Sequence, residues 1–390
     1  MCIILGYLAG KTSIRRAIAW CARHLDELRV YMPLENGVAS VSTAWRILAG
    51  VDAELFRLEF MAWAGEIIDP DGKHIAVDGK AFCASASKVS DNGSPMALNA
   101  IEVGTGLVIG HFPLSGKGNE ITALPKLLEQ LSLRGSTVTI DAIGTQTAIM
   151  GMILDLGAHF TLFVKKNQPT AYEDIITFFE VMSEDRRKMA ENPHHRPEYP
   201  EQMGAYDEWS AVEKNRERME YRTAGACSDC SHLGKKTEEW TYVSTIGFSK
   251  QVRIKISRDA DGNDTTPSLE EFLKGNPEES DEKDAPVQLI GMVSDRELKA
   301  REMAVFRRNH WAVENRLHHV LDDTFREDRS PAKKTVHSLA IVRKIAYNVI
   351  RLVMLEEGVV RTVPEMMDIF ADEVDRAAKV VFEPVAGMIE

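Results

Sequence analysis

Acidic and imidazole side chains recur every four residues in the stretch HWAVENRLHHVLDDTFRED, residues 310–328. The stretch lacks Gly and Pro, and its apolar residues recur at helical spacing, which predicts an amphipathic helix running to about Asp323. On such a helix four residues form a slowly rotating row along one face: His310, Glu314, His318 and Asp322. A carboxylate among imidazoles favours a polar site, although a surface stripe without function gives the same pattern when the helix is considered alone.

Two strand-like runs each end in an aspartate. In HIAVDGK, residues 74–80, an apolar run ends in Asp78, and in STVTIDAIGTQ, residues 136–146, a β-branched run ends in Asp141. An open α/β sheet places functional groups at the ends of its strands, whereas turn chemistry or helix capping is the usual role of a single Asp there. Three acids on two strands and one helix favour a shared site.

Length and composition bound the class of protein. A chain of 390 residues, 44% hydrophobic and 27% charged, predicts two or three structural units rather than one core. No apolar run is long enough to cross a bilayer, and residues 1–10 are too short and poorly flanked for a secretory signal, so we expect a cytoplasmic protein without membrane contact. An odd count of five cysteines fits a reducing compartment. Cys227 and Cys230, with His232 nearby, could form part of a zinc site, but no second Cys pair exists and an incidental pair is favoured.

The order of the expected elements defines a fold class. Residues 1–68 are expected to be a helical region, with helices over 14–28 and 42–64. Residues 69–181 predict a strand at 75–78, a hairpin of 96–103 and 107–113, a helix at 119–132, a strand at 137–141, a helix at 145–156, a strand at 159–164 and a helix at 170–181. Three strands followed by alternating helix and strand predict a mixed five-stranded sheet with flanking helices. This α/β order is the ribonuclease-H-like topology.

The second half of the chain breaks the alternation. Residues 182–291 are interpreted as an insertion, β-rich at 206–222 and 239–257. Residues 259–284 then hold ten acids against two lysines, which predicts a largely disordered or mobile loop. Residues 292–355 carry the final helices, including one over 335–355, and residues 356–390 form an acidic, partly helical region.

The net charge of −12 averages over unlike segments. Residues 296–351 contain thirteen Lys and Arg against seven Asp and Glu, a local charge of +6 around Glu314. A polyanionic backbone requires positive charge of this kind, because phosphate neutralisation supplies most non-specific affinity for nucleic acid.

Four segments, taken in order, resemble one family. They are IAVDGK at 75–80, TIDAIGTQ at 139–146, KKNQPT at 165–170 and HWAVENRLHHVLDDTFRED at 310–328. The chain resembles a bacterial insertion-sequence DDE transposase of the H-repeat-associated kind, with a ribonuclease-H-like catalytic domain and a helical N-terminal region, and the likeness extends to about residue 355. By that likeness Asp78, Asp141 and Glu314 fall on the family's acidic triad, while Lys165 to Gln168 match a segment near the site.

The resemblance implies divalent-metal-dependent DNA cleavage at the ends of the element and strand transfer into target DNA. Mg²⁺, with Mn²⁺ as a substitute, would be held by the triad, because hard divalent ions prefer carboxylate oxygen. The expected partners are double-stranded DNA, as terminal inverted repeats and as target, and a second copy of the chain in the active complex. Candidate DNA contacts are Lys80, Lys165, Lys166, Asn167, Gln168, Arg307, Arg308, His310, Asn315, Arg316 and His318, with Lys333 and Lys334 as further phosphate contacts.

Departures from the family pattern keep alternatives open. Ala81-Phe82-Cys83 follows Lys80 where the family has Thr, Leu and Arg, and the start of the chain is short. Arg307, His310 and Leu321 occupy the spacing where related transposases carry Tyr, Arg and Lys. One alternative is a catalytically inactive, transposon-derived DNA-binding protein. The other is a zinc hydrolase using His310, Glu314 and His318, which lacks the His-Glu-x-x-His order and leaves both strand acids unexplained.

Overall fold

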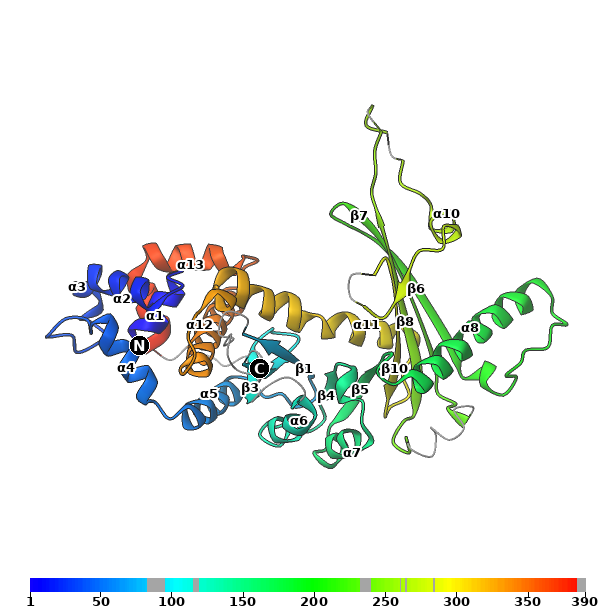
Figure 1. Cartoon of the computed structure of the whole chain (residues 1–390), viewed down its shortest axis with the longest axis horizontal. Helices are drawn as coiled ribbons and strands as arrows, with labels where there is room; N and C mark the ends of the chain where they lie inside the picture. The colour runs from blue at the N-terminus through cyan, green and yellow to red at the C-terminus, as the bar shows by residue number, and fades with distance from the viewer. Residues whose placement is uncertain are drawn as a thin grey trace. The chain divides into compact units, whose positions relative to one another are not determined.

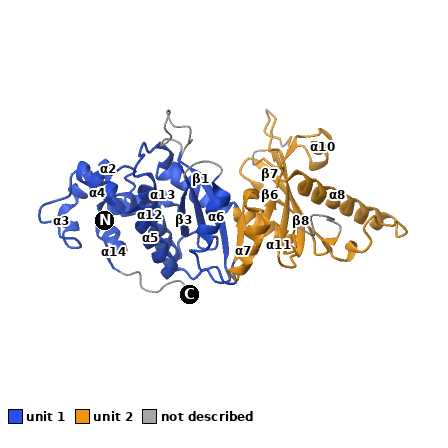
Figure 2. Cartoon of the chain, turned by 60° about the horizontal axis from the view of Figure 1, so that its bottom comes forward, with its two compact units in different colours: residues 1–136, 311–390 blue, residues 137–310 orange. Residues whose placement is uncertain are grey.

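The computed structural model describes residues 1–82, 95–114, 119–231, 240–259, 261–263, 265–282 and 285–383. Two compact units divide the chain (Figure 2). Unit 1 comprises residues 1–136 and 311–390, and unit 2 comprises residues 137–310. Both contain helices and strands, so the α/β class is confirmed (Figure 1). Among the described residues, no helix is long and apolar enough to cross a membrane.

Unit 1 contains an antiparallel meander of three strands in the order β3-β2-β1. The strands are β1 (His74–Ala81), β2 (Met96–Glu102) and β3 (Val108–Leu114). Gly106 has a φ of +75° in the turn between β2 and β3, a conformation that glycine adopts without steric cost. The register pairs Asp78 with Asn99 and Asn99 with His111. These three side chains therefore share one face of the sheet, which positions the candidate site.

Helices from both ends of the chain build the rest of unit 1. They are α1 (Cys2–Leu8), α2 (Ile14–Arg23), α3 (Leu25–Leu28), α4 (Val41–Gly50), α5 (Ala53–Ile67), α6 (Glu120–Leu128), α12 (Val336–Glu356), α13 (Val363–Asp372) and α14 (Val374–Phe382). Leu5, Trp20 and Leu28 share one apolar cluster with Val374 and Ala378. The acidic C-terminal region thus completes the core of the N-terminal helices, a pairing that the sequence did not predict.

The strands of unit 2 form a sheet in the order β4-β5-β10-β8-β7-β6, in which β4 and β5 are parallel and the remaining neighbours antiparallel. Their bounds are β4 (Thr137–Ile140), β5 (His159–Val164), β6 (Tyr206–Asn215), β7 (Arg218–Cys227), β8 (Thr245–Lys255) and β10 (Val287–Ser294). The expectation of five strands with a separate β-rich insertion is therefore wrong in one respect. The strands of the insertion extend this sheet, because β10 pairs on one side with β5 and on the other with β8.

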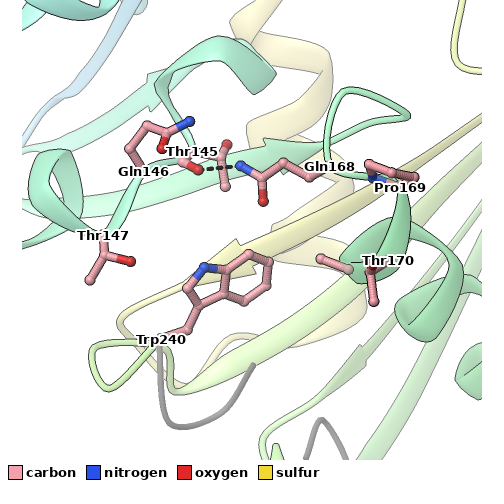
Figure 3. A pocket seen from close by; sticks show the side chains of 8 residues that line it. Thr145, Gln146, Thr147, Gln168, Pro169, Thr170 and Trp240 are labelled. Carbon is pink, nitrogen blue, oxygen red and sulfur yellow. Dashed lines mark hydrogen bonds between the residues drawn. The ribbon is translucent and has the colours of Figure 1, made fainter. Parts of the chain in front are cut away.

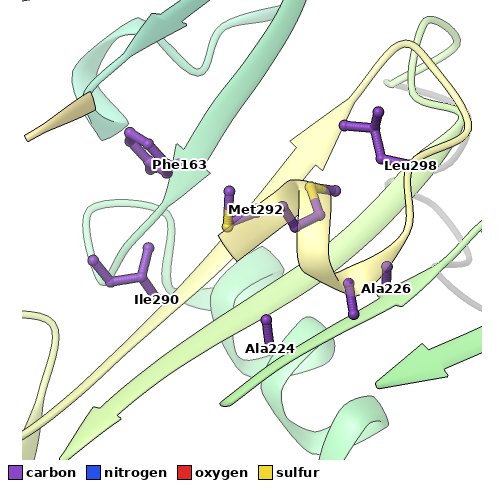
Figure 4. Packing of buried hydrophobic residues seen from close by; sticks show 8 residues of the cluster. Phe163, Ala224, Ala226, Ile290, Met292 and Leu298 are labelled. Carbon is purple, nitrogen blue, oxygen red and sulfur yellow. The ribbon is translucent and has the colours of Figure 1, made fainter. Parts of the chain in front are cut away.

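Two helices cover opposite faces of the unit 2 sheet. Ala224 and Ala226 of β7 pack with Met303 of α11 (Ala300–His310), in the cluster that Figure 4 shows with Phe163, Ile290, Met292 and Leu298. A Cβ on Gly225, between those two alanines, would lie 3.0 Å from Phe179 of α8 (Pro169–Glu191). Because successive strand residues point to opposite faces, α8 covers the face away from α11. Unit 2 also contains the helix α7 (Thr147–Asp155), between β4 and β5 in the sequence.

The acidic segment is more ordered than its composition predicts. Within residues 259–284, α10 (Leu269–Lys274) begins with a capping box between Ser268 and Glu271, and β9 (Glu279–Ser280) pairs with β10. Leu269 and Phe272 of α10 pack against a cluster that includes Val252. The capping box and two apolar contacts therefore stabilise α10, although the many acids of this segment predicted a disordered loop.

The prediction of a helix after His310 is confirmed, but most of this helix is wound as a π-helix. Val313–His318 and Val320–Thr324 form π-helical turns in place of α-helix. A hydrophobic period cannot distinguish the two windings over so short a segment. π-helical turns are rare and often occur at functional sites.

Candidate active site

The second half of β1 faces the π-helical segment through two charged side chains of unit 1. Asp78 and Lys80 lie two residues apart and thus on one face of the strand. Asp78 Oδ2 lies 3.6 Å from Nδ1 of His318, and the Lys80 ammonium pairs with Asp322 at 2.5 Å. Lys80 also lies 3.7 Å from Asp328 and is only 5% exposed, which makes it part of a buried ion network.

A chain of hydrogen bonds fixes His318. His111 Nδ1 lies 3.2 Å from Asn99 Oδ1, and Asn99 Nδ2 lies 3.3 Å from His318 Nε2. If the Asn99 amide donates to Nε2, that nitrogen is an acceptor, and the proton of a neutral His318 lies on Nδ1, toward Asp78. Burial holds the pKa of His111 well below its usual range, which keeps that ring neutral. The sequence did not single out Asn99 or His111; the only available signal was a polar residue within each of two buried strands.

Glu314 lies on the same π-helical segment, four residues before His318, and is half-buried. This segment packs directly on β1. Unit 1 therefore brings the elements carrying Asp78 and Glu314 into contact.

Asp141 follows β4 in unit 2 and pairs with a lysine that follows β5. Because β4 and β5 are parallel neighbours, the residues after them emerge at the same edge of the sheet. Lys165 Nζ lies 2.7 Å from Asp141 Oδ1. Burial acts to raise the pKa of Asp141, but the charge and hydrogen bond of Lys165 outweigh it, so the pKa lies below the usual range. Asp141 is held as a carboxylate.

Two amides attach the loop after β5 to the loop after β4. Asn167 Nδ2 donates to the carbonyl of Ala142 at 3.1 Å, and the Gln168 amide donates to the carbonyl of Thr145 (Figure 3). The segments TIDAIGTQ and KKNQPT therefore form one structure. Beside them lies a pocket of about 310 Å³, lined by polar residues and Trp240.

Several candidate DNA contacts are buried. In unit 2, Nδ1 of His310 lies 3.0 Å from Oγ1 of Thr139, and burial lowers the His310 pKa to about 4. The Arg307 guanidinium lies 5.6 Å from the centre of the Phe163 ring, and burial lowers its pKa to about 9. Together with His318 in unit 1, which is 8% exposed, these side chains expose little surface to solvent.

Other candidate contacts lie on the surface. Lys166 and Asn315 are exposed. Arg308 pairs with Glu213 at 2.9 Å, and Arg316 donates to the carbonyl of Val103 at 2.8 Å. Arg308 and Arg316 therefore already have partners within the chain.

The carboxylates offer donors that suit a hard cation. Asp78 and Asp141 are 32% and 43% exposed at their side chains, and carboxylate oxygen is the ligand that Mg²⁺ prefers. Within the part of the chain that the structure describes, no three His, Cys, Asp or Glu side chains form a group that could hold a metal ion. Asp78 and Glu314 belong to unit 1 and Asp141 to unit 2. Neither Cys227 nor Cys230 forms a disulfide with another described residue, and His232 lies outside the described residues.

Comparison with known proteins identifies the family. Residues 64–349 match the family described as "Transposase DDE domain", and residues 1–64 match its associated N-terminal family. The chain belongs to the DDE transposase family.

Its relatives are of the H-repeat-associated kind. The chain is 28% identical to "H repeat-associated putative transposase YhhI" of Escherichia coli K12 over 84% of this chain and 77% of that protein. It is equally similar, over the same shares, to "Putative protein YbfL" of that strain. Among solved structures, a piggyBac transposase synaptic complex with hairpin DNA aligns with a TM-score of 0.38 and 10% identity, over 81% of this chain and 55% of that one.

Proposed function

We propose that this transposase cleaves DNA at the ends of an insertion sequence and joins them to target DNA, using Asp78, Asp141 and Glu314 to hold Mg²⁺, or Mn²⁺ in its place. The observation that carries the proposal is that the two strand acids and the helical acid fall inside the matched DDE domain. Asp78 lies within β1, Asp141 directly follows β4, and Glu314 lies on the π-helical segment. A ribonuclease-H-like arrangement of these elements is part of the proposal.

Paired divalent ions would activate the attacking oxygen and stabilise the departing 3′-oxygen of an in-line displacement. The residues of this chain prepare the site. His318, fixed by Asn99, orients the Asp78 carboxylate, and Lys165 balances the charge of Asp141. Lys165 and Lys166 are placed to contact phosphate once DNA is bound, and joining two element ends requires at least two copies of the chain.

A nicking assay tests the proposal. The substrate is DNA carrying the inverted repeats that flank the coding region, incubated with Mg²⁺ or with EDTA. We expect wild-type protein to nick it only with Mg²⁺, and Asp78→Asn, Asp141→Asn and Glu314→Gln each to abolish nicking. Asp155→Asn and Glu129→Gln, which change exposed acids outside the site, serve as matched controls and should nick normally.

Metal binding gives a second readout that does not depend on activity. Titration of Mn²⁺ by electron paramagnetic resonance should show weaker binding in each triad variant than in the two controls. A wild-type protein that shifts the DNA on a gel and never cuts it would favour the inactive DNA-binding protein. Full nicking by any triad variant would remove that residue from the site.

A further inference from the structure

A groove in unit 1, lined by neither Asp78 nor Glu314, combines an aromatic side chain with three cations. Its cavity of about 490 Å³ lies between α4 and the segment that leads into α12, both in unit 1. The residues that line it are Trp45, Arg46, Ala49, Pro331, Ala332, Lys333, Lys334 and Thr335. We call this the α4 groove.

The charge of the α4 groove is not neutralised within the described chain. Arg46, Lys333 and Lys334 are exposed, and none of them forms an ion pair with any described residue. Arg46 only donates to Thr43, one turn earlier on α4. No lining residue is acidic, α4 itself contains no acid, and the first turn of α12 contains none. The groove therefore presents three positive charges that have no ion-pair partner among the described residues, in a chain whose net charge is −12.

Trp45 adds a flat apolar surface beside these cations. Trp45 is 37% exposed, and the small Ala49, four residues later, lies on the same face of α4. Proteins that hold nucleic acid strands combine a positive groove for the backbone with aromatic side chains on which bases or sugars stack. A protein partner would need an acidic, apolar segment to match this surface, whereas a nucleic acid strand supplies both the negative charge and the stacking group.

We infer that the α4 groove binds a DNA strand, with Lys333, Lys334 and Arg46 on its phosphates and Trp45 against a base or sugar. The inference deepens the proposed function, because it assigns a DNA-docking surface outside the acidic triad. The groove joins the helical N-terminal region, which carries Trp45, to the segment just after the helix that carries Glu314. DNA held there contacts two parts of the chain that are distant in sequence.

Binding measured without catalysis tests the inference. The full-length protein is titrated against a short fluorescent DNA duplex carrying the flanking repeats, and against its single strand, in EDTA over a series of NaCl concentrations. We expect Lys333→Ala/Lys334→Ala to bind about tenfold more weakly and to lower the salt slope by about two, because each lost phosphate contact removes about one released counterion. Lys333→Arg/Lys334→Arg should retain the affinity. Trp45→Ala should weaken binding at least about fivefold while the salt slope stays unchanged, because stacking releases no counterions.

Lys126→Ala/Lys299→Ala is the matched control, since it removes two exposed lysines outside the groove. Equal affinity of Lys333→Ala/Lys334→Ala and this control would overturn the inference. So would a change in sedimentation of Trp45→Ala with unchanged DNA binding, which would mark the groove as a contact between protein chains. The nicking assay separates the two proposals. If the groove variants lose DNA binding but the wild-type protein never nicks DNA, the proposed chemistry alone is wrong. If the wild-type protein nicks DNA and the groove variants bind it normally, the groove inference alone is wrong.

Discussion

Asn99 Nδ2 lies 3.3 Å from Nε2 of His318, and both side chains are buried. The other end of the Asn99 side chain faces His111, so the amide connects a neutral, fully buried imidazole of β3 to the imidazole beside Asp78. In metal sites, partners of this kind orient the ligands, and their loss commonly costs ten- to a hundredfold in metal affinity or activity. Under the proposed function, in which Asp78 holds the metal, Asn99 acts as a positioning residue for Asp78.

Asn99→Leu should remove the amide that fixes His318 while keeping a side chain of similar size. We expect the nitrogen NMR shifts of the His318 ring to change from one tautomer to a mixture, and Mg²⁺-dependent nicking to fall about tenfold or more at saturating DNA. Unchanged binding in EDTA would show that the loss lies in the site and not in DNA docking. If nicking falls but the His318 tautomer is unaltered, Asn99 acts through packing and the positioning role is wrong.

Lys165→Met should raise the pKa of Asp141, because the lysine charge and hydrogen bond outweigh burial. A depressed carboxyl pKa contributes stability that is present above the ordinary value of 3.8 and is lost as the pH falls through the lower folded value. The variant should therefore lose its resistance to acid unfolding at a higher pH than wild type. Carboxyl-carbon NMR titration of Asp141 measures the shift directly.

Lys166→Met is the matched control for Lys165→Met, since the Lys166 side chain is exposed and only its backbone N–H bonds Asp281. If the pKa of Asp141 is the same in Lys165→Met and Lys166→Met, the 2.7 Å ion pair between Lys165 and Asp141 does not form in solution.

The sequence predicts much of the secondary structure, because runs of apolar and β-branched residues identify strands without reference to distant parts of the chain. The run before Asp141 forms β4 and the strand predicted at 159–164 forms β5, whereas β1 continues past its predicted end at Asp78 to Ala81. The strand β10 was missed, although Val287–Ser294 is an apolar run. It follows the acidic segment, and its partners β5 and β8 lie far away in sequence. The local sequence therefore does not indicate which strands β10 pairs with.

Long-range pairing also limits what the sequence predicts about the site. Asn99 appears as one polar residue in the apolar strand MALNAIE, and its meaning emerges only when the register places it between Asp78 and His111. The ion pair of Lys80 with Asp322 joins residues from opposite ends of the chain. The four-residue spacing identified the row of polar side chains that contains Glu314, His318 and Asp322. It could not indicate which strand this row packs against.

Lys344 of α12 is fully buried, and its Nζ has no hydrogen-bond partner among the described residues. Burial lowers its pKa from 10.5 to about 8, with Glu327 as the opposing attraction and Lys80 and Arg343 adding repulsion. Below about pH 8 both folded and unfolded chains bind the proton, so the folded protein carries the full cost of a buried charge. Between about 8 and 10.5 the unfolded chain binds more protons than the folded one, and the stability should rise with pH.

Lys344→Met, which keeps the length of the side chain, should therefore be more stable than wild type at neutral pH, by roughly 3–4 kcal/mol at about 1.4 kcal/mol per pKa unit. The advantage should shrink toward zero as the pH rises through the window from about 8 to 10.5, because wild type then folds with a neutral amine. Urea unfolding at several pH values measures both effects, and Lys126→Met, at an exposed position, should show neither. A Lys344→Met variant that is less stable than wild type throughout this range would mean that the ammonium is stabilised in the folded state, with Glu327 as its counter-ion, and that the buried charge favours folding.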